Sequence, residues 1–158
     1  LQATQIRLGP ARLTHCMRWL GLSKRCLEEA SAYVAHRMSF GQTLAAHEGV
    51  QWMLGDVAKD IQIGRLLTMQ AAWKLDQGDF ARSDISIAKI HAADTLHKAA
   101  DTAIQLLGAR GYSKDTIVEW IYRYARQARL VDGASEIHKM VLSRAYLSEG
   151  QDFFRWGV

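Results

Sequence analysis

Residues 83–108 read SDISIAKIHAADTLHKAADTAIQLLG, and this stretch decides the expected fold class. Apolar residues recur in it every three or four positions, as on one face of a helix: Ile85, Ala88, Ala92, Leu96, Ala99, Ala103 and Leu106. Gly108 ends the pattern, and Ser83 or Asp84 can cap its start. The stretch therefore predicts a long amphipathic helix that buries one side.

The same helical spacing extends toward the N-terminus. It predicts a first helix over about residues 10–37, with Pro10 in its first turn, where proline is well tolerated. Phe40 and Gly41 break this helix. Thr43 can cap a second helix, which runs to Gly78.

On the C-terminal side we expect a short helix over about 116–128 and a last helix over about 135–149. No alternation typical of strands competes with these patterns. Helices with such apolar stripes pack against one another in antiparallel fashion. The sequence therefore predicts an all-α fold, an antiparallel up-and-down four-helix bundle with one additional short helix.

The composition fits a single helical domain. The chain has 158 residues, 49% of them hydrophobic, and Pro10 is its only proline. Cys16 and Cys26 lie ten apart on one predicted helix, so we expect no disulfide and a reducing compartment. The sequence contains no apolar run long enough to predict a transmembrane segment. Because the chain opens with Leu1 and lacks a signal-peptide pattern, we expect an excised piece of a larger protein.

Charge and histidine spacing narrow the function classes. The formal net charge is +4, but the sequence contains no block of basic residues that would predict binding to nucleic acid. The six histidines form neither an HExxH motif nor an i,i+4 pair, so no metal site is expected. We expect the methionines to fill the core for the most part: Met17, Met38, Met53, Met69 and Met140.

The strongest candidate for chemistry is a carboxylate in residues 123–136, RYARQARLVDGASE. Asp132 lies on a glycine-containing turn before the last helix, beside apolar residues such as Val131. A carboxylate in such surroundings is a candidate for proton transfer. The alternative is structural, since Asp132 or Ser135 can cap the following helix.

Several motifs occur in the chain in a fixed order. They are Arg37-Met38-Ser39-Phe40-Gly41, His47, Leu107-Gly108-Ala109-Arg110-Gly111-Tyr112, Arg123-Tyr124-Ala125-Arg126 and Asp132-Gly133-Ala134-Ser135-Glu136-Ile137. Together they resemble the C-terminal helical domain of the acyl-CoA dehydrogenase family, and the resemblance runs from Arg12 to the last helix. This sequence has Asp132 where the family usually has glutamate, Ala134 in place of threonine and Ala109 in place of glycine. It is therefore most similar to the aspartate-bearing branch.

The resemblance implies a role for each matching residue. Asp132 would be the base that removes the α-proton of an acyl-CoA thioester while the β-hydride passes to FAD. Arg12 would lie near the acyl-CoA, and Arg37 would pair with the FAD pyrophosphate of a neighbouring subunit. The remaining expected FAD contacts are Ser39, Phe40, Gln105, Gly108, Ala109, Gly133 and Glu136.

The resemblance also implies a setting. Residues 1–158 would be the C-terminal domain of a larger flavoenzyme of fatty acid β-oxidation, inactive alone, that forms a homodimer or homotetramer. Its electron acceptor would be an electron-transfer flavoprotein. Its location would be the cytoplasm of a bacterium or the mitochondrial matrix of a eukaryote. Two alternatives stay open: a related flavin oxidase of the nitroalkane or acyl-CoA oxidase type, and a non-catalytic helical scaffold.

Overall fold

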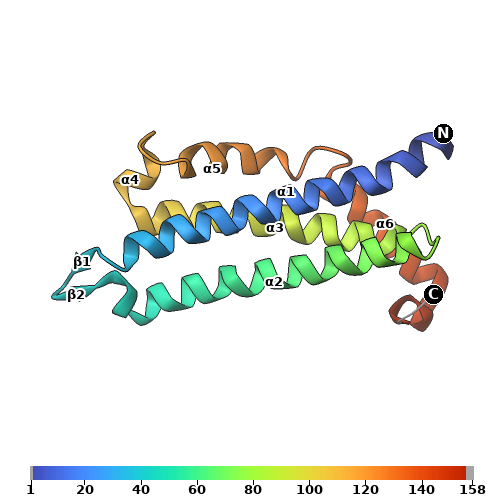
Figure 1. Cartoon of the computed structure of the whole chain (residues 1–158). Coiled ribbons are helices and arrows are strands. Elements are labelled where there is room, and N and C mark those ends of the chain that lie inside the picture. The colour runs from blue at the N-terminus through green and yellow to red at the C-terminus, as the bar shows by residue number, and fades with distance from the viewer. Residues whose placement is uncertain (1, 156–158) are drawn as a thin grey trace.

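The computed structural model describes residues 2–155, with side chains from Arg7 onward. Helices make up most of it, in an order that Figure 1 follows from blue to red. The elements are α1 Gln2–Val34, β1 Met38–Ser39, β2 Gln42–Thr43, the 3-10 helix η1 Leu44–Ala46, α2 Glu48–Asp76, α3 Arg82–Leu107, α4 Ala109–Tyr112, α5 Val118–Gln127, α6 Ser135–Glu149 and the 3-10 helix η2 Gly150–Phe154. The prediction of an all-α bundle is confirmed.

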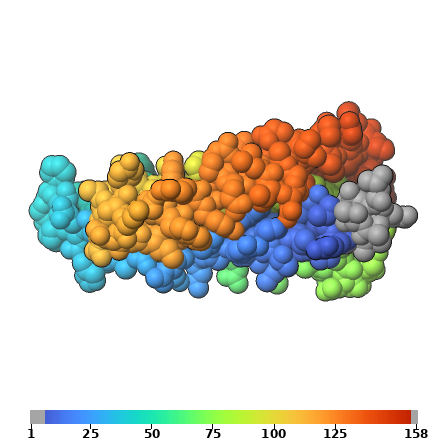
Figure 2. All heavy atoms as spheres, turned by 90° about the horizontal axis from the view of Figure 1, so that it is seen from above, coloured from blue at the N-terminus to red at the C-terminus, as the bar shows by residue number. Residues whose placement is uncertain are grey.

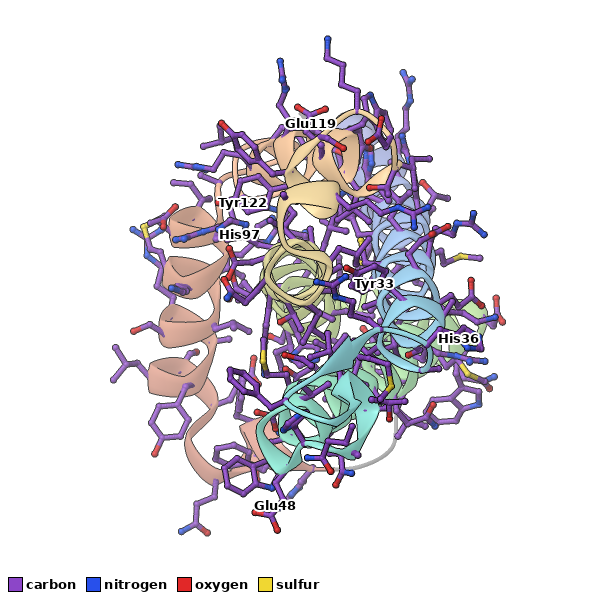
Figure 3. All side chains as sticks on the ribbon, turned by 90° about the vertical axis from the view of Figure 1, so that its left-hand side faces the viewer. Tyr33, His36, Glu48, His97, Glu119 and Tyr122 are labelled. Atoms are coloured by element: carbon purple, nitrogen blue, oxygen red, sulfur yellow. The ribbon has the colours of Figure 1, made fainter. Side chains whose placement is uncertain are left out.

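Four helices run along the bundle, and a fifth crosses it. Helices α1, α2 and α3 follow one another in antiparallel fashion, and α5 returns along them from α4 (Figure 1). Helix α6 runs across the end of the bundle, where it contacts α3. Viewed from the end that carries β1 and β2, α3 lies at the centre with the other helices around it (Figure 3).

The position of α3 follows from its sequence. The residues of its predicted apolar stripe are all at most 7% exposed. Most of them are alanines, and their small side chains let neighbouring helix backbones approach closely. The larger residues of the core come from the helices around it, such as the fully buried Trp19, Val57 and Ile121 of α1, α2 and α5.

Pro10 lies inside α1 instead of in its first turn, so the predicted start of this helix was wrong. Proline removes a backbone donor and crowds the preceding turn, which disfavours a helix that continues through it. Packing offsets this cost, because Leu13 is buried in one cluster with Ala81 and Ile85 at the start of α3. The long contact between α1 and α3 therefore extends to Leu13, close to Pro10.

The predicted helix caps were also wrong. The N-cap residues of α2, α3 and α6 are His47, Ala81 and Ala134, and none of them makes a side-chain cap bond. Asp84 instead pairs with Lys74 on α2 at 3.0 Å. The chain enters α3 through a turn in which the Ala81 N–H donates to Asp79, so the capping polar groups lie outside the expected positions.

Four of the five methionines are exposed, so the expectation that most would fill the core was wrong. Met17 and Met69 are 64% and 66% exposed, and they line a groove of about 470 Å³ between α1 and α2. Leu66, also exposed, lies on the same helix as Met69. An apolar surface of this kind is typical of a contact with another protein chain or domain.

Two observations bear on the expectations of no disulfide and of no transmembrane segment. Cys16 and Cys26 are both buried on α1 as free thiols, and burial raises the pKa of each to about 12. Across residues 2–155, none of the helices is both long enough and apolar enough to span a membrane.

Candidate functional site

The structure divides the expected site residues between two places. Arg37, Ser39 and Phe40 belong to the β1–β2 hairpin region, and Gln105, Gly108 and Ala109 lie at the junction of α3 and α4. Figure 1 shows the hairpin and α4 at the same end of the bundle. Arg12, Asp132, Gly133 and Glu136 lie instead around the turn between α5 and α6. We call these two groups the hairpin end and the Asp132 turn.

At the hairpin end, a histidine fixes the loop. His47 Nε2 lies 3.2 Å from the backbone carbonyl oxygen of Ser39, and its Nδ1 lies 3.2 Å from the side-chain amide nitrogen, Nε2, of Gln42. Since a carbonyl only accepts, Nε2 carries the proton and Nδ1 accepts from Gln42. Phe40 extends from this loop with 96% of its surface exposed, in a left-handed backbone conformation with φ of 50°.

Arg37 is available for a contact outside the described chain. It is exposed, and its guanidinium makes no hydrogen bond or ion pair with any residue between Arg7 and Arg155. Its backbone is held, because its N–H donates to Tyr33 and its carbonyl accepts from Leu44. Figure 3 shows Tyr33 and His36 near this point, at the end of α1. A fixed backbone with a free guanidinium suits an anion-binding role.

At the α3–α4 junction, the chain turns at Gly108, whose φ of 60° and ψ of −138° are accessible mainly to glycine. Gln105 and Ala109 beside it are both exposed. Three residues on, a Cβ at Gly111 would lie 2.9 Å from Ile104 Cα and from Leu107 Cβ. Gly111, the second glycine of the Leu107–Tyr112 motif, is therefore required by the packing of α4 on α3.

The Asp132 turn has an unusual backbone. Asp132 and Gly133 have φ values of 53° and 96°, so two consecutive residues are left-handed. Aspartate tolerates this region better than most residues, and glycine does so freely. In Figure 2 the turn belongs to the ridge of α5 and α6 that lies beside α1. The carboxylate of Asp132 does not cap α6, so the capping role considered for it is excluded.

Donors from three helices hold this turn. Arg12 Nε on α1 and His138 Nε2 on α6 lie 3.0 and 3.3 Å from the carbonyl oxygen of Asp132. Lys89 Nζ on α3 lies 2.8 Å from the carbonyl oxygen of Gly133. These contacts satisfy both carbonyls of the left-handed pair, which stabilises a conformation that the chain alone would disfavour.

Lys89 is the least expected of these donors. Its side chain is fully buried, and its Nζ lies over the ring of Trp19 at 5.7 Å. Burial lowers the pKa of Lys89, while the nearby Cys16 and Asp132 act in the opposite direction. Sequence reasoning missed this residue, although its place on the apolar face of α3, four positions after Ile85, was a signal.

His138 is held as a neutral ring. Its Nε2 must donate to the carbonyl of Asp132, so its Nδ1 accepts from the hydroxyl of Ser86 at 3.0 Å. Burial lowers the pKa of His138, which keeps the ring uncharged near neutral pH. His138 and Arg12 also line a mostly apolar cavity of about 430 Å³ beside the turn.

The two carboxylates near the turn differ in their partners. Glu136 pairs with Arg129 at 3.1 Å, and its pKa is lowered by a backbone hydrogen bond and by that arginine. Asp132 is 28% exposed at its side chain, and its Oδ2 lies 2.7 Å from His15 Nε2. Its Oδ1 has no partner among the described residues, so this oxygen can accept a proton.

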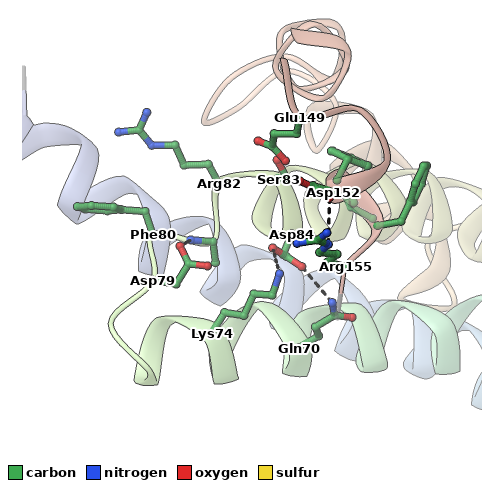
Figure 4. Close-up of a pocket in the computed structure, with 14 residues that line it drawn as sticks. Gln70, Lys74, Asp79, Phe80, Arg82, Ser83, Asp84, Glu149, Asp152 and Arg155 are labelled. Carbon is green, nitrogen blue, oxygen red and sulfur yellow. Dashed lines mark hydrogen bonds and ion pairs between the residues drawn. The ribbon is translucent and has the colours of Figure 1, made fainter. Parts of the chain in front are cut away.

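A different cavity, of about 520 Å³, lies between the α2–α3 turn and η2 (Figure 4). Two of its acidic side chains are engaged: Asp84 accepts from Lys74 and Gln70, and Asp152 pairs with Arg155 at 3.0 Å. Carboxylates paired in this way are poor candidates for a base. The Asp132 turn is therefore the better candidate site.

Comparisons with known proteins identify the family of this chain. The family model for "Acyl-CoA dehydrogenase, C-terminal domain" matches residues 1–147. The probable acyl-CoA dehydrogenase FadE2 of Mycobacterium tuberculosis is 38% identical over 98% of this chain and 38% of its own length. The probable acyl-CoA dehydrogenase IBR3 of Arabidopsis thaliana is 36% identical over 91% of this chain and 18% of its own length.

A solved structure of a glutaryl-coenzyme A dehydrogenase bound to glutaryl-CoA has the same fold. It superposes with a TM-score of 0.89 at 30% identity, covering 99% of this chain and 40% of that one. The chain thus spans well under half the length of its relatives. It belongs to the acyl-CoA dehydrogenase family, in which it corresponds to the C-terminal domain.

Proposed function

We propose that Asp132 is the base of an FAD-dependent acyl-CoA dehydrogenase whose C-terminal domain is this chain. In the proposed reaction, Oδ1 of Asp132 takes a proton from the α-carbon of an acyl-CoA thioester. FAD, when bound, takes up the hydride from the β-carbon. Arg12, Lys89 and His138 hold the backbone of the turn that carries this carboxylate.

The observation that carries this proposal is the free Oδ1 on a carboxylate with a fixed backbone. A base must lie within hydrogen-bond reach of the proton it removes, and errors near 1 Å can cost about a hundredfold in rate. Aspartate is one carbon–carbon bond, about 1.5 Å, shorter than the glutamate usual in the family. The donors from Arg12, Lys89 and His138 fix where this shorter side chain starts.

The hairpin end fits the FAD contacts that the family resemblance implies. Arg37 offers a free guanidinium, which suits the bidentate recognition of a pyrophosphate. Phe40 is almost fully exposed and offers a flat apolar surface, and Ser39 lies beside it. Gln105, Gly108 and Ala109 present an exposed helix end close by.

The distance between the hairpin end and the Asp132 turn favours contacts of the two sites with different FAD molecules. Arg12 lies within α1 and Val34 at its C-terminal end, which separates them by roughly 33 Å at 1.5 Å per residue. A single cofactor at the Asp132 turn would have to bridge that length to reach Arg37. We therefore propose that Arg37 binds the FAD of a neighbouring subunit, so that the protein acts as a homodimer or homotetramer.

We also propose an electron-transfer flavoprotein as the acceptor of the electrons, by family membership.

The test of the proposed dehydrogenation uses the full-length protein mixed with acyl-CoA substrates of several chain lengths without oxygen. The proposal predicts loss of visible flavin absorbance and formation of the α,β-unsaturated thioester. In air, rapid consumption of oxygen without an added acceptor would identify an oxidase instead. Unchanged flavin absorbance with every acyl-CoA tested would contradict the proposed reaction.

A further inference from the structure

One side chain contacts the carboxylate of Asp132 directly. The Nε2 atom of His15, on α1, lies 2.7 Å from Asp132 Oδ2. Both side chains are about one quarter exposed, at 25% and 28%, so the contact lies at the surface of the domain and is open to a substrate. Neither the expected motif roles nor the proposed reaction uses His15.

The neighbours of His15 fix its tautomer. Nη2 of Arg18 lies 2.8 Å from His15 Nδ1, and a guanidinium can only donate. Nδ1 is therefore an acceptor, and the proton of the neutral ring is on Nε2, which lies 2.7 Å from Asp132 Oδ2. Arg18, His15 and Asp132 thus form two successive polar contacts, in which Arg18 faces Nδ1 of His15 and Nε2 of His15 faces Asp132.

The ring is also held in place. It stacks on Trp19 with ring centroids 5.5 Å apart and planes inclined by 25°, and Trp19 is fully buried. Nη1 of Arg18 lies 3.4 Å from the hydroxyl of Tyr124 on α5, so Arg18, which contacts the ring, is itself linked to a second helix. A ring fixed on both sides can act as an orienting group.

The other charged groups around the turn are engaged elsewhere. Arg12 and His138 contact the backbone carbonyl of Asp132, and Lys89 contacts that of Gly133. Glu136 pairs with Arg129, and the thiol of Cys16 is buried. Within residues 7–155, His15 is thus the group that distinguishes one oxygen of the Asp132 carboxylate from the other.

We propose that His15 is a positioning residue: its Nε2–H occupies Oδ2 of Asp132 and leaves Oδ1 as the oxygen that receives the substrate proton. In that step the Cα–H bond of the substrate breaks and an O–H bond forms at Oδ1. The bonding electron pair becomes part of the Cα=Cβ double bond as the hydride leaves the β-carbon. His15 neither gains nor loses a proton. This inference rests on the proposed function of Asp132.

The test compares three substitutions at His15 in the full-length holoenzyme. His15→Gln keeps an amide N–H near the place of Nε2, whereas asparagine is shorter by one carbon–carbon bond, about 1.5 Å, and cannot reach. His15→Ala and His15→Asn should lower the limiting rate of flavin bleaching roughly ten- to a hundredfold. His15→Gln should keep most of that rate. The acyl-CoA concentration for half-maximal rate should stay the same in all three.

Two control variants separate the possible failures. Thr14→Ala changes the exposed neighbour of His15 and should bleach like the parent, and Asp132→Asn should bleach roughly 10²–10⁴-fold more slowly. If Asp132→Asn is slowed in this way while His15→Ala bleaches at the parent rate, the positioning role is wrong and the proposed function stands. If Gln and Asn at position 15 give equal rates, the role of the Nε2 donor is also wrong. If Asp132→Asn bleaches normally, the proposed function itself fails, and the role of His15 with it.

Discussion

Lys89 donates from its buried Nζ to the carbonyl oxygen of Gly133 at 2.8 Å, and so links the centre of α3 to the turn that carries Asp132. No carboxylate lies within ion-pair distance of this amine among residues 7–155. An unpaired buried ammonium is costly, so its presence here points to a role in holding the turn.

The first prediction follows from the pKa of Lys89. Burial lowers this pKa below its ordinary value of 10.5, so between the two values the unfolded state binds more protons than the folded state. The contribution of Lys89 to the free energy of unfolding should therefore rise with pH over that window. Lys89→Met should remove the rise, and Lys139→Met, at an exposed site on α6, should keep it. Urea unfolding at several pH values up to 10.5 measures this, and parallel curves for the parent and Lys89→Met would contradict it.

The second prediction concerns two glycines in different surroundings. A Cβ at Gly111 would lie 2.9 Å from Ile104 Cα, whereas one at Gly55, inside α2, would meet nothing within 4 Å. Gly111→Ala should lower the free energy of unfolding by about 1–3 kcal/mol, because backbone must move to accept the methyl group. Gly55→Ala should raise it by about 0.5–1 kcal/mol through helix propensity. Equal effects of the two changes would show that the packing of α4 on α3 is looser than described.

The third prediction concerns Arg37 and the cofactor. Loss of a charge-assisted contact to a pyrophosphate should cost about 1.5–3 kcal/mol of FAD affinity, or roughly ten- to a hundredfold. Arg37→Ala in the full-length protein should thus lose FAD on dilution or gel filtration while its helices stay folded. Arg25→Ala is the matched control, since Arg25 is also exposed on α1 but pairs with Glu29. Retention of FAD and oligomer size by Arg37→Ala would rule out the contact between subunits.

Sequence periodicity was sufficient for the helices but not for their N-caps or for the start of α1. The apolar stripe of α3 was correct at every position, because burial of one helix face leaves a regular spacing in the sequence. The caps at Thr43, Ser83 and Ser135 were not, since α2, α3 and α6 begin after His47, Ala81 and Ala134, which make no side-chain cap bond. Short two-residue strands such as β1 and β2 leave no alternation to detect.

The candidate site was predictable only where motifs carry it. The order of motifs identified Asp132 and its turn, but not His15, Lys89 or His138, which come from three different helices. Their contacts depend on how α1, α3 and α6 pack, and no local pattern encodes that. Arg12 was expected near the substrate, and the structure shows its Nε bound to the backbone of Asp132.

The most direct test of Asp132 as the base is the single-turnover rate of flavin bleaching by acyl-CoA in Asp132→Asn. Asparagine keeps the size and the hydrogen-bonding shape of the side chain but cannot accept a proton as a carboxylate does. We predict that the full-length variant binds FAD and acyl-CoA like the parent and that the bleaching rate falls by roughly 10²–10⁴-fold. A variant with bound FAD that bleaches at the parent rate would contradict the assignment of Asp132 as the base.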